Sequence, residues 1–193
     1  MFPEVQLAAI TREDVSRVDE WLNDTEVNSS WYGVDQHGIP LHIGYAPQEM
    51  RQASEDEWQQ VFQDDDRKIL SVYTKEGDHI GEGQLVIEWT RLEAQLFLLV
   101  GRKDLWHHHY GTAALIQLLD QAFDTFQLHR VWVDVPEYNE HALQMFRQLG
   151  FVLEGHLRGT HRKNDEWYDS MAMGLLSDEY SRRRARVLGN PAA

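Results

Sequence analysis

Apolar side chains recur along this chain with two spacings, which predict an order of strands and helices. An apolar residue at every second position indicates a strand, and apolar residues three and four apart indicate an amphipathic helix. Strands are expected over residues 5–10, 69–74, 79–89, 93–100, 131–135, 151–158 and 166–176. Helices are expected to start at Thr11, Ser54 and Ser177, and to cover residues 111–126 and 139–149. This succession is typical of an α/β protein.

Local signals support several of these boundaries. Thr11 followed by Asp14 resembles a capping box, in which each residue's side chain bonds the other's backbone N–H. Gly150 is well placed to stop the helix of residues 139–149. Residues 28–53, by contrast, lose all periodicity and are punctuated by glycine and proline. A stretch of that length in a compact domain is usually functional or mobile.

A polar turn joins a strand to a helix within residues 98–114. A helix that begins this way directs free backbone N–H groups and a positive dipole end at the turn, which suits a pyrophosphate. The strand of residues 131–135 follows, and then a helix that opens with Asn139 and closes with Gly150 and Phe151. This order resembles the acyl-CoA-binding half of the GNAT N-acetyltransferases. It is most similar to the branch that acetylates ribosomal-protein N-termini, polyamines and some antibiotics.

The resemblance implies a single α/β domain over residues 1–193, with a frayed tail over residues 188–193. Its sheet is expected to be mixed, mostly antiparallel, flanked by helices and splayed at the acyl-CoA site. Acetyl-CoA is expected as co-substrate, with the strand at 98–100 pairing with the pantetheine amides and the loop at 106–112 holding the diphosphate. The residues implied to bind it are Leu98, Leu99, Val100, Trp106, His107, His108, His109, Tyr110, Gly111, Thr112, Asn139 and Phe146. In the family, residues 28–53 would shape the acceptor pocket, where this chain offers Trp31, Tyr32, His37, His42 and Tyr45.

The chain departs from the family pattern at functional positions. The phosphate loop carries Trp106 and His109 where the family usually has a Gln or Arg and a first glycine. Phe146 replaces a tyrosine that protonates the departing thiolate, and Gln95 replaces a glutamate that often acts as base. A phenyl ring cannot give a proton and an amide cannot take one. In an active enzyme, water, the amine's own proton or other residues would have to supply these roles.

Acid–base candidates come from the remaining polar residues. Glu82 and Glu88 lie on one strand with a spacing that places them on the same face, so either is a candidate base. Asp134 and His141 are further options. Tyr138, next to Asn139, is the first candidate to replace the missing tyrosine acid.

Charge and composition narrow the chemistry. The formal net charge of −14 disfavours nucleic-acid binding and favours the approach of a cationic amine. No cysteine is present, which excludes disulfides, thiolate metal sites and a cysteine-linked acetyl-enzyme. The three consecutive histidines lack a nearby closed set of ligands, so no metal is expected. Neither a targeting segment nor a membrane span is apparent, and a cytoplasmic protein is expected.

The expected function is transfer of acetyl from acetyl-CoA to a primary amine, directly and within a ternary complex. A protein N-terminus, a polyamine and another small amine all remain open as acceptors. One alternative is an aminoglycoside-type acetyltransferase, and another is a GNAT-fold protein that binds acyl-CoA without catalysis, as the changes at Gln95 and Phe146 suggest. Acyl length and oligomeric state, a homodimer included, stay open.

Overall fold

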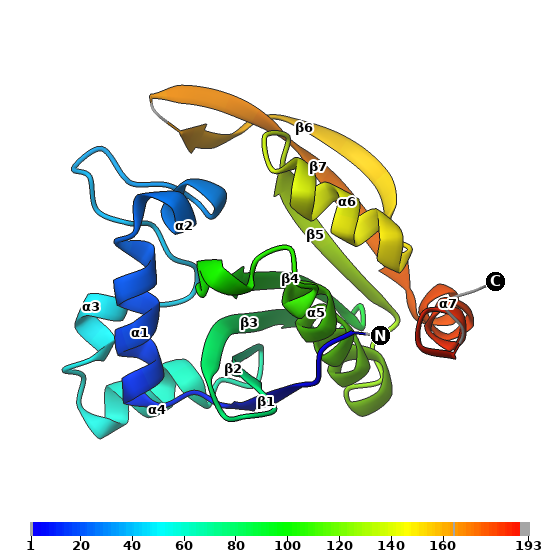
Figure 1. Ribbon diagram of the computed structural model, residues 1–193, viewed down its shortest axis with the longest axis horizontal. Helices are drawn as coiled ribbons and strands as arrows, with labels where there is room; N and C mark the ends of the chain where they lie inside the picture. The colour runs from blue at the N-terminus through cyan, green and yellow to red at the C-terminus, as the bar shows by residue number, and fades with distance from the viewer. Residues whose placement is uncertain (1, 164, 190–193) are drawn as a thin grey trace. The chain divides into compact units, whose positions relative to one another are not determined.

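The computed structural model describes residues 2–163 and 165–189, which form an α/β fold with a seven-stranded mixed sheet. The strands are β1 (Val5–Ala9), β2 (Arg67–Thr74), β3 (His79–Glu88), β4 (Glu93–Val100), β5 (Arg130–Pro136), β6 (Val152–Lys163) and β7 (Glu166–Leu176). The helices are α1 (Arg12–Leu22), α2 (Thr25–Ser30), α3 (Pro47–Met50), α4 (Glu55–Phe62), α5 (Tyr110–Asp120), α6 (Glu140–Leu149) and α7 (Ser177–Gly189). The hydrogen-bonded strand order is β1-β2-β3-β4-β5-β7-β6 (Figure 1).

The chain falls into two compact units. The N-terminal unit comprises Phe2–Ile87 and Phe97–Leu118, and the C-terminal unit comprises Glu88–Leu96 and the described residues from Leu119 onward. The strand β4 and the helix α5 each contribute residues to both units. That residues 1–193 act as one acyl-CoA N-acyltransferase domain stays a prediction.

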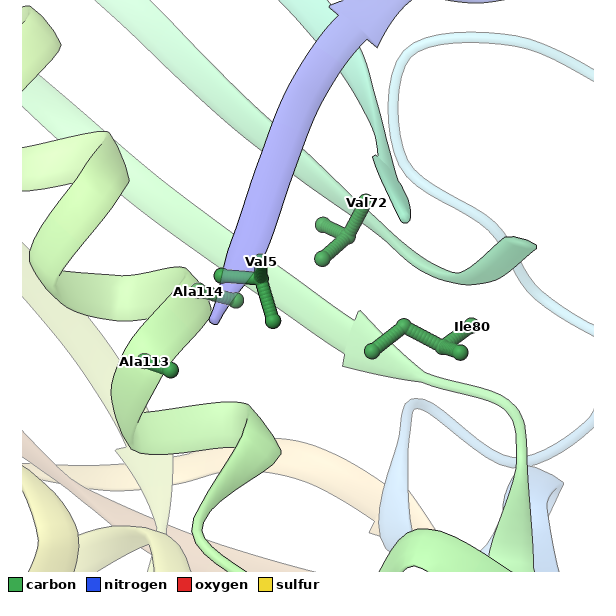
Figure 2. Close-up of a cluster of buried hydrophobic side chains, with 5 residues drawn as sticks. All are labelled: Val5, Val72, Ile80, Ala113 and Ala114. Atoms are coloured by element: carbon green, nitrogen blue, oxygen red, sulfur yellow. The ribbon is translucent and has the colours of Figure 1, made fainter. Parts of the chain in front are cut away.

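In the N-terminal unit, β2 pairs antiparallel with β1 on one side and with β3 on the other. Buried Val5, Val72 and Ile80, one from each of these strands, meet Ala113 and Ala114 of α5 in one apolar cluster (Figure 2). Because alanine side chains are small, the helix backbone can approach the strands closely. This packing holds the first turns of α5 against the sheet.

A second apolar cluster connects α1 and α2 to the end of β4. Its buried members are Val18, Leu22, Val27 and Leu99. Gly101 follows β4 directly, and a Cβ there would lie 1.9 Å from the ring of Trp21. No side chain fits at that position, so the chain leaves β4 in close contact with α1.

In the C-terminal unit, β7 pairs antiparallel with β5 and with β6, and β6 and β7 form a long hairpin (Figure 1). The parallel ladder between β4 and β5 joins Glu93, Ala94 and Gln95 to the start of β5. Gly150 ends α6 with a φ of 102°, a left-handed conformation that glycine adopts without steric cost. This confirms the helix stop predicted from the sequence.

The predicted fold class is confirmed, and several boundaries differ from prediction. The strand expected over 151–158 runs to Lys163, and the helix expected over 111–126 ends in a π-helical turn, η2 (Gln121–Thr125). The stretch of 28–53, predicted to be irregular, includes the second half of α2 and all of α3. Within the predicted frayed tail, residues 188–189 belong to α7, and residues 190–193 lie outside the described residues.

Candidate active site

The predicted phosphate loop follows β4 through a single 3-10 turn, η1 (Lys103–Leu105), and ends where α5 begins at Tyr110. His107 and His109 both adopt left-handed backbone, with φ of 63° and 64°. Histidine is among the few non-glycine residues enriched in that region. The loop therefore has a left-handed residue at 109, the position where the family usually has a glycine.

The Trp106 side chain anchors this loop to the body of the N-terminal unit. Its indole Nε1 donates a hydrogen bond of 2.8 Å to the carbonyl oxygen of Val100. Its ring packs on the cluster that contains Val18, Leu22 and Leu99. Trp106 thus holds the loop to the end of β4, a structural role that the sequence did not reveal.

The remaining residues of the predicted cofactor set differ in exposure. His107, His108 and His109 are exposed, whereas Thr112 is buried and Tyr110 packs against the cluster around Val5. The carbonyl oxygen of His109 accepts a hydrogen bond from the N–H of Ala113, which fixes the start of α5. In the strand before the loop, Leu99 is buried, while Leu98 and Val100 are half-buried.

A buried carboxylate on β3 is surrounded by donors from the irregular segment before α3. Glu82 is 2% exposed, and its Oε2 accepts a hydrogen bond from the Tyr45 hydroxyl. Its Oε1 accepts a bond of 2.7 Å from Gln84 Nε2 and lies 3.1 Å from His42 Nε2. The structure therefore joins the predicted base candidate to His42 and Tyr45, two of the aromatic residues predicted for the acceptor region.

Gln84 and Arg67 fix the backbone beside His42. Gln84 Nε2 also donates to the carbonyl oxygen of Ile43 at 2.8 Å, and Arg67 Nη1 donates to Gln84 Oε1 at 2.9 Å. Gly44 has a φ of 91°, and a Cβ there would lie 2.7 Å from Arg67 Nη1. Both backbone conformation and space therefore favour glycine at this position.

The protonation of this group follows from its burial. Desolvation, together with the charge of Glu82 and the hydrogen bond to it, raises the pKa of Tyr45 well above its usual value of 10.0. Tyr45 therefore stays neutral and donates to the carboxylate. The His42 side chain is 1% exposed, and its Nδ1 has no hydrogen-bond partner among the described residues. The same holds for Nε1 of Trp31, whose ring centroid is 6.0 Å from that of His42.

Glu88, the other candidate base on β3, has a different environment. It is the last residue of the strand and is exposed. Its Oε1 accepts a 2.5 Å hydrogen bond from the Thr90 hydroxyl, which closes the following turn. The shared face expected from alternation therefore yields one buried carboxylate, Glu82, and one exposed carboxylate. Strand alternation does not govern burial where the strand ends.

Asn139 and Phe146, both predicted to bind the cofactor, have structural contacts in the C-terminal unit. Asn139 Oδ1 accepts a hydrogen bond of 3.2 Å from the N–H of Ala142, so the residue caps α6. Phe146 is buried, and its ring meets that of Phe151 edge to face at 5.1 Å. These contacts account for both residue types without a cofactor.

The Tyr138 side chain, the candidate acid, is held by aromatic and cationic neighbours. Its ring is 5.1 Å from that of Tyr168, and Lys163 Nζ lies 4.4 Å above it. Its hydroxyl is buried and has no hydrogen-bond partner among the described residues. Burial and the neighbouring Tyr168 raise the pKa of Tyr138, so the hydroxyl keeps its proton.

Asp134 belongs to a polar group across β5, β6 and β7 that the sequence did not predict. His161 Nε2 lies 3.4 Å from its Oδ2. Burial raises the pKa of Asp134, but hydrogen bonds from His161 and Ser170 outweigh burial and hold it below 3.8. A low pKa makes Asp134 a weak base. His141 is exposed on α6, and Gln95 is half-buried on β4.

One trio of potential metal ligands is present among the described residues. Ligand atoms of Glu137, His156 and Asp169 lie within 4.8 Å of one another, and the first two side chains are exposed. Asp169 Oδ1 accepts a hydrogen bond from the N–H of Gly159 at 2.8 Å, and Glu137 Oε1 accepts one from the N–H of Asp169. These bonds explain the convergence without an ion. The consecutive histidines of the phosphate loop form no such group among the described residues.

Comparisons with known proteins agree with this arrangement. Residues 4–152 match the family described as the acetyltransferase (GNAT) domain. The spermidine N(1)-acetyltransferase of Vibrio cholerae is 23% identical over 186 residues, which cover 95% of this chain and 99% of that protein. The crystal structure of the Vibrio cholerae spermidine N-acetyltransferase with CoA and spermine is 21% identical, with a TM-score of 0.76 over 92% of this chain and 98% of that one. A Vibrio cholerae spermidine/spermine N-acetyltransferase with manganese ions is 22% identical, with a TM-score of 0.69 over 93% and 96% of the two chains.

The chain belongs to the GNAT acetyltransferase domain family. By class it is an acetyl-CoA-dependent N-acetyltransferase. Among the described residues, no helix has the length and apolar character needed to cross a bilayer.

Proposed function

We propose that this protein transfers acetyl from acetyl-CoA directly to a primary amine of a polyamine while both substrates are bound. The observation that carries the acceptor class is the buried carboxylate of Glu82 beside Trp31, His42 and Tyr45. A carboxylate and aromatic rings together favour an alkylammonium group. The net charge of −14 and the polyamine substrates named for the Vibrio cholerae relatives support the same class.

The acetyl-CoA side of the proposal rests on β4 and the loop after it. The backbone of Leu98, Leu99 and Val100 would pair with the pantetheine amides. The N–H groups of residues 110–112 begin α5, where the helix dipole favours a diphosphate. The left-handed backbone of His109 allows the turn that a glycine usually makes, and the Trp106 anchor fixes the loop to β4.

Direct transfer is favoured because the chain has no cysteine to carry an acetyl group. The amine nitrogen would attack the thioester carbon, and the C–S bond would break with its electrons on sulfur. Tyr138 is the proposed donor of a proton to this thiolate, in place of the tyrosine that Phe146 replaces. Its buried hydroxyl, which has no hydrogen-bond partner among the described residues, supports this role.

Thiol release from acetyl-CoA tests the proposal. Wild-type protein is assayed with spermidine, an aminoglycoside, a peptide with a free N-terminus and a primary amine that carries no other charged group. The highest kcat/KM is expected for spermidine. A preference for the aminoglycoside or the peptide would contradict the polyamine assignment. Calorimetric binding of coenzyme A without thiol release from any amine would instead identify a non-catalytic binding protein.

The proposed acid is tested with two variants. Tyr138→Phe is expected to lower kcat about 10²-fold. This is the lower end of the 10²–10⁴-fold that general acid catalysis is typically worth, because a thiolate leaves readily. Phe146→Tyr is expected to raise kcat or leave it unchanged. Full activity of Tyr138→Phe would show that Tyr138 is not the acid.

A further inference from the structure

In the proposed reaction a base must take a proton from the acceptor amine, and Glu82, the predicted base, is poorly placed to do so. Alkylamines have pKa values near 10, so they arrive as ammonium ions at neutral pH and must lose a proton before attack. Glu82 is buried, and both of its carboxylate oxygens are occupied. Oε2 accepts from the Tyr45 hydroxyl, and Oε1 accepts from Gln84 Nε2 and contacts His42 Nε2. These contacts already take up three of the about four acceptor sites that a carboxylate offers.

His42 has the opposite arrangement at its two ring nitrogens. Nε2 lies 3.1 Å from Glu82 Oε1, and since a carboxylate only accepts, Nε2 carries the hydrogen in this contact. In the neutral ring, Nδ1 then bears the lone pair. That atom is buried and has no partner among the described residues. A buried polar atom without a partner is costly unless another state of the protein supplies one.

We propose that His42 Nδ1 is the general base that takes the proton from the acceptor amine, and that Glu82 is the positioning residue that fixes the His42 tautomer. This inference rests on the proposed function. The N–H bond of the ammonium breaks, and its proton passes to Nδ1. The freed nitrogen lone pair then forms the new C–N bond as the C–S electrons leave with sulfur. The nitrogen loses a second proton as the amide forms, and this proton replaces the one that Tyr138 gives to the thiolate. The imidazolium that results is stabilised by the adjacent carboxylate, as in other acid–histidine pairs.

The charges around His42 agree with this role. Glu82 supplies the adjacent negative charge, and Tyr45 stays neutral because burial and that carboxylate raise its pKa. Arg67 contacts Gln84 Oε1 and is thus separated from His42 by an uncharged amide. A protonated His42 therefore gains an ion pair with Glu82, while Arg67 is hydrogen-bonded to the amide of Gln84.

His42 Nδ1 is buried, so access to it requires a neighbouring segment to move. Residues 33–41 form a small hairpin held by its own bonds, with Asp35 Oδ1 accepting from the N–H groups of His37 and Ile39. The segment is attached to α2 through Asn28 Nδ2, which donates to the carbonyl oxygen of Gly33. A unit bonded mainly to itself can shift without losing its internal contacts. Displacement of this hairpin, with Trp31, would open Nδ1 to the amine.

The base assignment is tested with two amines and one pair of matched variants. His42→Gln removes the base, and His129→Gln is the control because His129 is exposed at the start of the β5 region in the other unit. With spermidine at neutral pH, His42→Gln is expected to lose 10²–10⁴-fold in kcat. With a fluorinated primary amine that is already neutral at the assay pH, the loss should be less than about tenfold, since no ammonium must be deprotonated before attack. His129→Gln should match wild type on both.

The pH profile gives a second readout that a purely structural role would not change. Wild-type kcat/KM for spermidine should reach a plateau once His42 is neutral. In His42→Gln it should keep rising about tenfold per pH unit towards the amine pKa near 10, where the substrate deprotonates by itself. Glu82→Gln should lower kcat more than it raises KM, because the tautomer is no longer fixed. Coenzyme A titration and thermal melting establish that each variant is folded.

Nitrogen NMR of the wild-type ring keeps the proposal testable if a variant does not fold. The expected spectrum has a protonated Nε2 and an unprotonated Nδ1 at the pH where kcat/KM for spermidine is constant. The opposite tautomer, or equal losses of His42→Gln on both amines, overturns the role of His42. Full activity of His42→Gln in an active wild-type background overturns this inference alone. Absence of thiol release by wild type with every amine overturns the proposed function as well.

Discussion

Two buried groups in the N-terminal unit combine a carboxylate, a histidine and a tyrosine, yet their surroundings differ. Asp14 on α1 is fully buried and accepts bonds from Ser71 at 2.9 Å and from the Tyr73 hydroxyl at 2.6 Å. It also contacts Arg17 Nη1 at 3.0 Å and lies 3.3 Å from His79 Nδ1. Its partners lie on regular elements. The donors to Glu82 include two from the irregular segment that precedes α3.

The two histidines differ in which nitrogen faces the carboxylate. His79 Nε2 lies 2.9 Å from the carbonyl oxygen of Gly81, its Nδ1 faces Asp14, and its ring contacts those of Trp21 and Tyr73. In His42, Nε2 faces the carboxylate of Glu82. Nδ1 has no hydrogen-bond partner among the described residues in either histidine. The same three residue types therefore turn the unpartnered nitrogen towards the carboxylate in one group and away from it in the other. The orientation of the histidine, rather than the residue types, separates the two roles.

The largest expected effect is on stability. Asp14→Asn should lower the free energy of unfolding by about 3–5 kcal/mol, because it removes one partner of a buried charged group and leaves the others unpaired. Glu82→Gln should cost roughly 1–3 kcal/mol, since its donors in the irregular segment can shift towards water. Urea unfolding of both variants measures the difference. Equal costs would show that the Glu82 group is as structural as the Asp14 group.

Glycine substitutions in the segment beside Glu82 should have the next largest effect. Gly44 and Gly38 both have positive φ, of 91° and 78°, so either change to alanine should cost about 1–2 kcal/mol of strain. An added Cβ at Gly44 would also displace Arg67 and Gln84, whereas nothing lies within 4 Å at Gly38. Thiol release should therefore fall several-fold in Gly44→Ala only. A similar fall in Gly38→Ala would mean that the conformation of the whole irregular segment, rather than the contacts of Arg67 and Gln84, controls activity.

The pH dependence of stability should distinguish His79 from other residues. Burial lowers the pKa of His79 below 6.5, despite the opposing charge of Asp14. The unfolded state then binds the proton more readily, so stability is full above pH 6.5 and falls as the pH decreases below it. Urea unfolding between neutral and mildly acidic pH should show this loss in wild type and a flatter profile in His79→Gln. Parallel profiles would contradict the assignment.

Asp14 should affect stability at lower pH. Burial raises its pKa, but hydrogen bonds from Tyr73 and Thr11 and the charge of His79 outweigh burial and lower it from 3.8. A depressed folded pKa gives stability that is present above the unfolded value and is lost as the pH falls through the folded value. The loss due to Asp14 should therefore begin near pH 3.8, well below that due to His79.

The smallest expected effect is on substrate approach. If the net charge of −14 attracts a cationic acceptor, kcat/KM for spermidine should fall as salt rises through about 0.15 M, where the screening length is roughly 8 Å. The buried contacts of Asp14 are screened much less, so the difference in unfolding free energy between wild type and Asp14→Asn should change little. A flat kcat/KM would make the charge a matter of solubility alone.

Features that depend on residues close together in the chain could be predicted from the sequence. The Thr11–Asp14 capping box is formed, and Gly150 ends α6 as predicted. These signals work because a cap or a stop involves residues a few positions apart. The succession of strands and helices followed from the same local patterns, and the GNAT family was predicted from the resemblance of residues 98–151 to that family. The Asp24 cap of α2 is a local feature that was not predicted, although its side chain accepts from the N–H groups of Glu26 and Val27.

Contacts between side chains far apart in the chain could not be predicted in this way. His42 reaches Glu82 across 40 positions, and Asp14 reaches Ser71 across 57. Such contacts depend on strand pairing and on the path of an irregular segment, neither of which periodicity describes. Strand alternation predicted that Glu82 and Glu88 would lie on the same face. In the structure Glu82 is buried and Glu88 is exposed, because the last residue of a strand can turn to solvent. Whether a histidine nitrogen has a partner is decided in the same way, by groups brought close in space.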